Sequence, residues 1–341
     1  MTRIKVPQPI SGGLMLSYQC SAECRHCMYG CSPQWKGDWI PEKDLGDLLS
    51  LLAGKIVPSP LGGQAISLNH GLHFTGGEPF LNFDLLLKAV QMAHEVDIPS
   101  TFVETNCFWC RNDETAREKL QLLKEDSLRG ILISVNPFYL EYVPFERTER
   151  CIRISQQVFG ANVMVYQQEY YHRFKRLGLA DRIKLEDFLG LTGSENITER
   201  VELFLTGRAA HRLKGLYPSY PAQVFFNEPC RPSFLRNWHN HFDNYGNLLP
   251  GYCGGISLGD WHNLASLISE GIDLEEYPVL AFLIAEDIRG LLYFAHDFGY
   301  QDTPEGYVSK CHLCLDLRTY LVSNGDFQEL EPKEFYTHVS S

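Results

Sequence analysis

Three cysteines near the start of the chain have a spacing that favours metal ligation. Cys20, Cys24 and Cys27 follow a predicted strand in the order C-x3-C-x2-C. Three thiolates can hold three irons of a four-iron cluster, and the open fourth iron can then coordinate a small molecule and pass it an electron. A zinc site and scattered buried thiols are the alternatives, although zinc prefers paired C-x2-C ligands that close to four. Cys31 leaves open a different trio with Cys24 and Cys27, or a simple packing role.

A glycine-rich segment, Thr75-Gly76-Gly77-Glu78-Pro79, ends the second predicted strand and precedes a predicted helix. It therefore lies on the carboxyl-terminal rim of a parallel sheet, where the sites of parallel α/β folds assemble. Paired glycines let the backbone approach a ligand and present its N–H and C=O groups without a side chain in the way. Taken alone, the segment also fits an ordinary strand-to-helix turn.

Together the two motifs resemble the signature of the radical S-adenosylmethionine superfamily, in which C-x3-C-x-aromatic-C, here with His26 as the aromatic residue, precedes Gly-Gly-Glu-Pro. The resemblance implies that Cys20, Cys24 and Cys27 hold a [4Fe-4S] cluster whose open iron binds the amino and carboxylate groups of S-adenosylmethionine. Reductive cleavage of that cofactor gives a 5′-deoxyadenosyl radical in this family. The resemblance also implies that one segment contacts the methionyl amino group: Gly76, Gly77, Glu78 and Pro79.

Further positions resemble cofactor contacts of the same family. Thr105 and Asn106 end the third predicted strand, where relatives often read Thr-Asn-Gly and where Cys107 here replaces the glycine. Ser134 ends the fourth strand and is similar to a residue that contacts ribose or carboxylate in related enzymes. Arg147 lies where several relatives keep an arginine for the methionine carboxylate, a pairing that suits the planar guanidinium group. A solvated helix residue is the alternative for Arg147.

Cys107 and Cys110 form a second C-x2-C at the same rim. A thiol at this place could donate a hydrogen atom to a substrate radical, as in some radical epimerases. It could equally ligate an extra metal or have no chemical role, because the pKa and exposure of a cysteine decide its reactivity.

Four later cysteines, Cys230, Cys253, Cys311 and Cys314, are enough to close a cluster without an open position. Their order, with a predicted hairpin between the first two, resembles the beginning of the SPASM/twitch auxiliary-cluster domains of the superfamily. The gaps between these cysteines are longer than in the usual pattern of those domains, and this part of the chain has fewer than the seven cysteines of a full SPASM domain. The resemblance implies one auxiliary [4Fe-4S] cluster. Zinc on the same ligands and packed free thiols remain alternatives, because spacing alone does not choose the metal.

The elements that must position these residues alternate between strands and helices. Short apolar runs separated by amphipathic stretches predict a parallel sheet with crossover helices. We therefore predict an α/β fold: a partial (β/α)6 TIM-type barrel over 1–215, followed by a C-terminal auxiliary-cluster domain over 216–341. The later domain is predicted to contain a hairpin that turns at 244–247 and a helix from about 279 to 298. The barrel elements are strands at 13–16, 71–75, 101–105, 130–135, 162–166 and 201–206, with helices at 83–96, 113–125 and 147–159.

Composition and hydropathy argue against two classes of partner, nucleic acid and membrane. Lys and Arg number 30 against 42 Asp and Glu, a net charge of −12, which disfavours nucleic acid as a partner. No apolar run approaches the roughly 20 residues that cross a bilayer, so we expect no membrane partner. The 11 cysteines are an odd number with clustered spacing, which indicates metal ligation in a reducing compartment, and we expect a cytoplasmic protein.

The resemblance implies a radical S-adenosylmethionine enzyme that takes a hydrogen atom from a peptide side chain, as in peptide natural-product maturation, or from a small metabolite. A radical dehydrogenase or epimerase of a small biosynthetic intermediate is the alternative among enzymes. A non-catalytic iron–sulfur electron-transfer protein is the alternative outside them. The resemblance also implies an external electron donor such as flavodoxin or ferredoxin.

Overall fold

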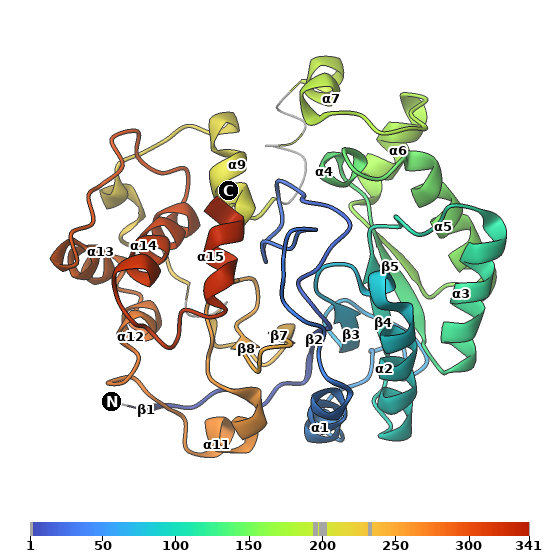
Figure 1. Cartoon of the computed structure of the whole chain (residues 1–341), viewed down its shortest axis with the longest axis horizontal. Coiled ribbons are helices and arrows are strands. Elements are labelled where there is room, and N and C mark those ends of the chain that lie inside the picture. The colour runs from blue at the N-terminus through green and yellow to red at the C-terminus, as the bar shows by residue number, and fades with distance from the viewer. Residues whose placement is uncertain (1–2, 194–196, 198–202, 231–233, 341) are drawn as a thin grey trace. The chain divides into compact units, whose positions relative to one another are not determined.

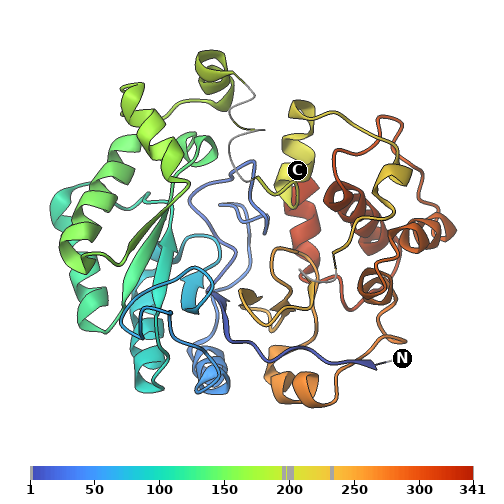
Figure 2. The same cartoon turned by 180° about the vertical axis from the view of Figure 1, so that it is seen from behind.

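The computed structural model describes residues 3–193, 197, 203–230 and 234–340 of the 341-residue chain (Figure 1, Figure 2). Its internal contacts divide the chain into two compact units. The barrel unit consists of Pro9–Cys24 and Cys31–Val201, and the C-terminal unit consists of Met1–Gln8, Arg25–Gly30 and Glu202–Ser341. The units therefore divide earlier than the predicted boundary between 215 and 216. The assignment of functional domains to 1–215 and 216–341 stays a prediction.

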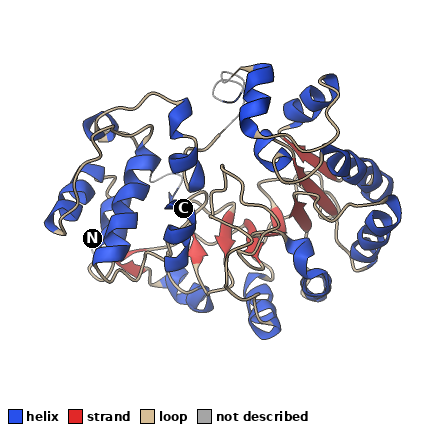
Figure 3. Ribbon diagram, turned by 45° about the horizontal axis from the view of Figure 1, so that its top comes forward, coloured by secondary structure: helices blue, strands red, loops and turns tan. Residues whose placement is uncertain are grey.

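The barrel unit is built on five parallel strands that follow one another in chain order (Figure 3). A parallel sheet in sequential order, with a helical crossover between strands, is the arrangement of an open βα barrel. The predicted α/β class and partial TIM-type barrel are thus confirmed. The strands are β2 (Ser11–Met15), β3 (Gly71–Thr75), β4 (Phe102–Thr105), β5 (Gly130–Ser134) and β6 (Val163–Tyr166).

The predicted sixth strand is wrong for the part that the structure describes. Residues 203–206 form no strand, and residues 201 and 202 lie outside the described residues. Leu203, Phe204 and Leu205 are only half-buried and lead directly to Gly207, whose φ of 55° turns the chain into α9 (Arg208–Arg212). The described barrel therefore has one strand fewer than its sequence predicts.

Asparagine side chains cap the starts of α2 (Phe83–Glu95) and α3 (Asp113–Glu125). Asn82 accepts a hydrogen bond from Leu85 N at 3.2 Å, and Asn112 accepts one from Thr115 N at 2.8 Å, which satisfies backbone donors that a helix start leaves open. The predicted helices at 83–96 and 113–125 are confirmed, and the third begins two residues earlier than predicted. The main helices are α1 (Glu42–Leu52), α2 (Phe83–Glu95), α3 (Asp113–Glu125) and α5 (Phe145–Phe159), with the shorter α4 (Pro137–Leu140), α6 (Gln168–Arg176) and α7 (Leu185–Thr192).

The two faces of the barrel sheet differ in chemistry, because successive residues of a strand point to opposite faces. The residues of one face are apolar and fully buried: Leu14, Phe74, Val103, Ile131 and Ile133. The alternate positions carry most of the polar side chains of these strands: His73, Thr75, Glu104, Ser134 and Tyr166. The second face is therefore the one on which the fold can assemble a site.

The C-terminal unit contains the predicted hairpin and a set of short helices. Strands β7 (Asn240–Phe242) and β8 (Leu248–Leu249) pair antiparallel around Gly246, whose φ is 95°. The N-terminal β1 (Arg3–Ile4) pairs antiparallel with β9 (Ile272–Asp273). The helices are α9, α11 (Leu264–Ser269), α12 (Pro278–Ile284), α13 (Ile288–Asp297), α14 (Lys310–Asn324) and α15 (Lys333–Ser340).

The helix predicted over 279–298 is two helices. Glu286 has a φ of 59°, which an α-helix does not permit, so the chain breaks between α12 and α13. Asp287 then starts α13 by accepting a hydrogen bond from Gly290 N at 2.7 Å. In the part of the chain that the structure describes, no helix has the length and apolar character needed to cross a bilayer.

Candidate cofactor site and cysteine clusters

Two segments that are distant in sequence meet beside the carboxyl ends of β2 and β3. Gly77 N donates a hydrogen bond to Ser17 O at 2.8 Å. A Cβ atom on Gly77 would lie 1.8 Å from Gln19 O, and one on Gly76, whose φ is 116°, would lie 2.3 Å from Ser17 O. Only glycine fits at both positions. The glycine pair therefore lies directly against the chain that leads into Cys20.

Glu78 joins this turn to the end of β4. Its buried carboxylate accepts hydrogen bonds from Phe80 N at 3.2 Å, Thr105 Oγ1 at 2.9 Å and Asn106 N at 2.8 Å. Burial raises the pKa of Glu78 to about 8, although the three donors favour the charged form. Pro79 follows as the first residue of the 3-10 helix η1 (Pro79–Asn82). Glu78 thus orders the protein around the turn, since its oxygens are used within the chain.

Asn106 reaches from β4 to the first cysteine. Its Nδ2 donates to Ser21 Oγ at 3.0 Å and lies 3.7 Å from Cys20 Sγ, while its Oδ1 accepts from Phe108 N at 3.0 Å. Donors to a ligand sulfur stabilise its negative charge and tune a metal centre. The structure thus brings together Cys20, the glycine turn and Asn106, three features that the sequence singled out separately.

The three cysteines of the first motif are divided between the units. Cys20 and Cys24 are buried in the barrel unit, and Cys27 is partly buried in the C-terminal unit. None of the 11 cysteines forms a disulfide, so disulfide bonding does not prevent any of them from binding a metal. Cys31, the alternative ligand, is buried in the barrel unit, where its role stays open.

The polar face of the sheet carries a carboxylate that the sequence reasoning missed. Glu104 accepts a hydrogen bond from Thr75 Oγ1 at 2.7 Å, and its second oxygen lies 3.6 Å from Nε2 of the buried His73. Burial raises the pKa of Glu104 to about 7, against the opposing effect of the Thr75 hydrogen bond. The sequence signal that could have identified Glu104 was the presence of one histidine and one glutamate within two otherwise mostly apolar strands.

Ser134 and Arg147 occupy different settings. Ser134 ends β5 and lines a small cavity together with Asn136 and Tyr139. Arg147 Nη1 donates to Phe108 O at 2.7 Å, so this side chain braces the loop after β4. A contact of either residue with S-adenosylmethionine stays a prediction.

Cys107 and Cys110 lie in a buried thiol cluster with Cys151. Cys107 has a φ of 69°, a left-handed conformation that favours glycine. Both side chains are fully buried. Burial, and then the neighbouring Cys151, raise the pKa of Cys107 and of Cys110 far above the ordinary value. The two groups are therefore protonated thiols, and their predicted role as hydrogen-atom donors remains a prediction.

The four late cysteines come together in the C-terminal unit. Cys311 and Cys314 lie in the first turns of α14, and Cys253 follows β8. Burial raises the pKa of Cys253 to about 12, and the nearby thiols of Cys311, Cys314 and Cys230 also raise it. The thiols of Cys311, Cys314 and Cys230 are thus near enough to Cys253 to oppose its ionisation, an opposition that a bound cation would relieve.

Two buried cations accompany these thiols, and neither was singled out from the sequence. Arg318 is 2% exposed and donates from Nη1 to Gly254 O and to the Tyr336 hydroxyl, both at 3.0 Å. Lys310 is also buried and donates to Glu228 O. The field of Arg318 lowers the pKa of Cys253 and so partly offsets the effect of burial. Positive charge at this place suits a group carried by four thiolates.

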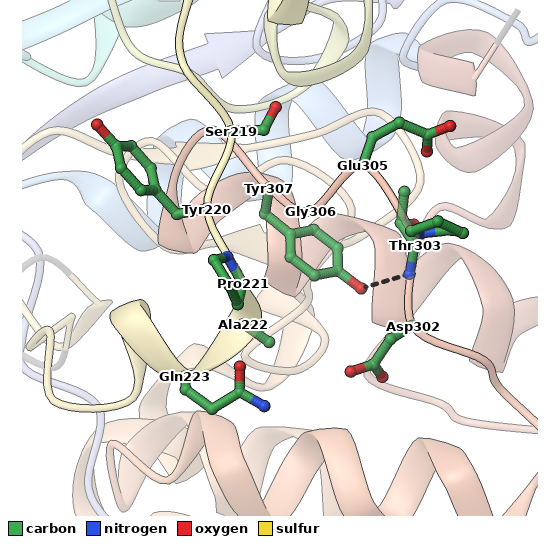
Figure 4. A pocket seen from close by; sticks show the side chains of 11 residues that line it. Ser219, Tyr220, Pro221, Ala222, Gln223, Asp302, Thr303, Glu305, Gly306 and Tyr307 are labelled. Atoms are coloured by element: carbon green, nitrogen blue, oxygen red, sulfur yellow. Dashed lines mark hydrogen bonds between the residues drawn. The ribbon is translucent and has the colours of Figure 1, made fainter.

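A separate cavity of about 170 Å³ lies between residues 219–223 and residues 302–307 of the C-terminal unit (Figure 4). Tyr220 and Tyr307 exchange backbone hydrogen bonds at 2.8 Å, and the Tyr307 hydroxyl accepts a hydrogen bond from Thr303 N at 3.2 Å. None of the residues predicted to act in the site lines this cavity.

The comparisons with known proteins found similar solved structures but no matching family model or curated protein. No protein-family model matches the chain, and no curated protein matches it. Among solved structures, BtrN in complex with AdoMet and 2-DOIA has a TM-score of 0.40 and 14% identity, over 77% of this chain and 83% of that chain. Native anSMEcpe with bound AdoMet has a TM-score of 0.45 and 13% identity, over 92% and 97%.

Streptococcus suis SuiB bound to S-adenosylmethionine has a TM-score of 0.47 and 14% identity, over 90% of this chain and 77% of that chain. Likenesses of this size do not decide an activity.

Proposed function

We propose that the chain is a radical S-adenosylmethionine enzyme whose first [4Fe-4S] cluster is held by Cys20, Cys24 and Cys27. One observation carries the proposal: the glycine turn after β3 and Asn106 after β4 both meet the segment that bears Cys20, with 2.8 Å from Gly77 N to Ser17 O and 3.7 Å from Asn106 Nδ2 to Cys20 Sγ. These residues fit such a cofactor, because the Cys20 sulfur lies beside an amide donor and a turn whose two glycines carry no side chains.

When bound, the cluster supplies the electron that cleaves S-adenosylmethionine to the radical that abstracts a hydrogen atom from the substrate. The residues of this chain prepare the place for that chemistry. Gly76 and Gly77 let the turn pack against residues 17–19, where Gly77 N donates to Ser17 O, and Glu78 fixes the turn to Thr105 and Asn106. Burial of Glu78, Thr105 and Asn106 keeps water out of this support. We assign Ser134 and Arg147 to S-adenosylmethionine as further contacts within this proposal.

We further propose that Cys230, Cys253, Cys311 and Cys314 hold a second, auxiliary [4Fe-4S] cluster. The convergence of the four thiols with the buried Arg318 supports a metal at this place. Zinc on the same ligands is the alternative that metal analysis separates. The proposed substrate is a peptide side chain or a small metabolite, and the proposed reductant is flavodoxin or ferredoxin.

The test is cleavage of S-adenosylmethionine by anaerobically reconstituted, reduced protein. We expect 5′-deoxyadenosine from the wild-type chain, none from Cys24→Ala, and retained product from Cys31→Ala, the matched control outside the proposed trio. A fully iron-loaded preparation that forms no 5′-deoxyadenosine would refute the enzyme and favour an iron–sulfur electron carrier.

The auxiliary cluster has its own test. A variant with alanine at Cys20, Cys24 and Cys27 is expected to keep about four irons per chain. One zinc per chain, or almost no metal, would contradict the auxiliary iron–sulfur cluster.

A further inference from the structure

The segment that bears Cys27 belongs to the unit that carries the four late cysteines. Arg25–Gly30 is part of the C-terminal unit, whereas Cys20 and Cys24 are part of the barrel unit. We propose that Tyr29 and Arg208 are positioning residues that hold Cys27 on the loop of Cys253, so that the late cysteine site stabilises the first cluster. This inference rests on the proposed function, because it takes Cys27 as a cluster ligand.

Arg208 fixes the backbone of the Cys27 segment. Its backbone N donates to Cys27 O at 3.0 Å, and its Nη2 donates to Gly30 O at 2.7 Å. Nε of the same side chain donates to His338 O at 3.0 Å, and Arg208 is only 1% exposed. The preceding Gly207 has a φ of 55°, and a Cβ atom there would lie 2.6 Å from Cys27 O. Arg208 thus holds both ends of a short segment in the C-terminal unit, Cys27 through its backbone and Gly30 through its side chain.

Tyr29 connects the same segment to the loop 250–255. Its hydroxyl donates to Gly251 O at 2.7 Å and lies 2.9 Å from His241 Nδ1. Met28 also lies close to this loop, because a Cβ atom on Gly254 would lie 2.6 Å from Met28 O. The residues beside Cys27 therefore pack directly against the residues beside Cys253.

The other side of this loop belongs to the late cysteines. Cys253 lies between Gly251 and Gly254, and Gly254 O accepts a hydrogen bond from the buried Arg318 at 3.0 Å. A metal bound by Cys253 restrains the loop, and the loop restrains Tyr29 and Cys27. Such linkage is reciprocal, so each occupied site increases the affinity of the other.

The experiment is a double-mutant cycle between Tyr29→Phe and Cys253→Ser, which separates a coupling from two independent effects. The measured quantity is the rate at which a chelator removes the first cluster from the reconstituted full-length chain. The first cluster is monitored through the part of the EPR signal of the reduced protein that changes when S-adenosylmethionine is added. Tyr320→Phe is the matched control, because it also removes a hydroxyl that donates to a backbone carbonyl in the same unit.

We expect Tyr29→Phe to speed the loss of the first cluster about fivefold, the factor that one ordinary hydrogen bond contributes. In the Cys253→Ser background, where cluster loss is already faster, Tyr29→Phe is expected to add little. An equal acceleration in both backgrounds, or none in either, overturns the inference and leaves the proposed function intact. A wild-type chain with iron but no response to S-adenosylmethionine refutes the proposed function itself, and the inference with it.

Discussion

The backbone N–H of Asn106 donates a 2.8 Å hydrogen bond to the buried carboxylate of Glu78 and so joins the end of β4 to the turn after β3. The other carboxylate oxygen accepts from Thr105 Oγ1 and Phe80 N. All three of these partners are donors. The carboxylate therefore acts as the acceptor that holds two strand ends at a fixed separation.

Replacement of Glu78 by glutamine places an amide donor against at least one of these donors. An unsatisfied buried donor costs about 1–3 kcal/mol, so the free energy of unfolding of the metal-free chain is expected to fall by that amount. Urea unfolding of Glu78→Gln against wild type at about pH 9, above the pKa of about 8 at which the Glu78 carboxyl ionises, measures the change. Glu95→Gln on the exposed face of α2 is the control and should leave the stability unchanged. Equal stability of Glu78→Gln and wild type would contradict the assigned role.

The close approach at Gly77 gives a second prediction. An added Cβ would meet Gln19 O at 1.8 Å, a backbone atom that cannot move without displacing the segment of Cys20. Gly77→Ala is expected to cost about 3 kcal/mol, the upper end of overpacking, and to lower iron loading at the first site. Gly190→Ala, at an exposed helical position of α7 with no atom near the new Cβ, should instead raise stability by about 0.5–1 kcal/mol. Urea unfolding of both variants tests whether Gly77→Ala lowers the stability and Gly190→Ala raises it, and iron analysis tests the effect on iron loading.

The barrel elements could be predicted because their signals are local. The apolar runs of β2 to β6 and the asparagine before α2 are read from neighbouring residues, as is the rim position of Gly76 and Gly77. The prediction of a sixth strand was wrong because residues 203–205 have the apolar composition of a strand but do not pair with another strand. The prediction of one long helix was wrong because no neighbouring residue indicates that Glu286 has a left-handed backbone conformation.

The parts of the site that were not predicted depend on contacts between distant segments. The burial of Arg318 beside Cys253, and the attachment of Tyr29 to Gly251, join residues far apart in the chain. Glu104 was hidden for a related reason, since its neighbour Thr75 lies on another strand. Sequence spacing could place the ligands of each motif, but not the groups that surround them.

The backbone at Cys107 predicts an unusual order of stabilities. Both Cys107→Gly and Cys107→Ala lose the thiol, but only alanine keeps a Cβ atom at a φ of 69°. The glycine variant is therefore expected to be more stable than the alanine variant by about 1 kcal/mol. At Cys151, inside α5, the order should reverse, because alanine favours a helix interior by about 1 kcal/mol over glycine. Denaturant unfolding of the four variants tests both orders, and a more stable Cys107→Ala would contradict the first.

The stability of the metal-free chain should depend on pH through Glu104. Burial raises the pKa of this carboxyl from 4.5 to about 7, so the folded chain binds its proton more tightly than the unfolded chain. The resulting stabilisation is complete below pH 4.5 and is lost as the pH rises through 7, by about 1–3 kcal/mol in total. Urea unfolding from pH 4.5 to 8 should show a smaller loss for Glu104→Gln than for wild type. Buried groups such as Glu78 titrate in both proteins and cancel in the comparison, so parallel curves would contradict the prediction.

The charge of Arg318 predicts the redox behaviour of the proposed auxiliary cluster. Reduction adds negative charge, and a buried guanidinium group beside Cys253 and Cys314 favours that state. Arg318→Met is expected to lower the midpoint potential by about 60 mV, a tenfold change in the one-electron equilibrium. The measurement is an EPR redox titration in the background of alanine at Cys20, Cys24 and Cys27, in which only the auxiliary cluster remains. Arg289→Met removes an exposed positive charge from the same unit and should leave the potential within error. An equal shift in both variants would mean that net charge, and not the position of Arg318, sets the potential.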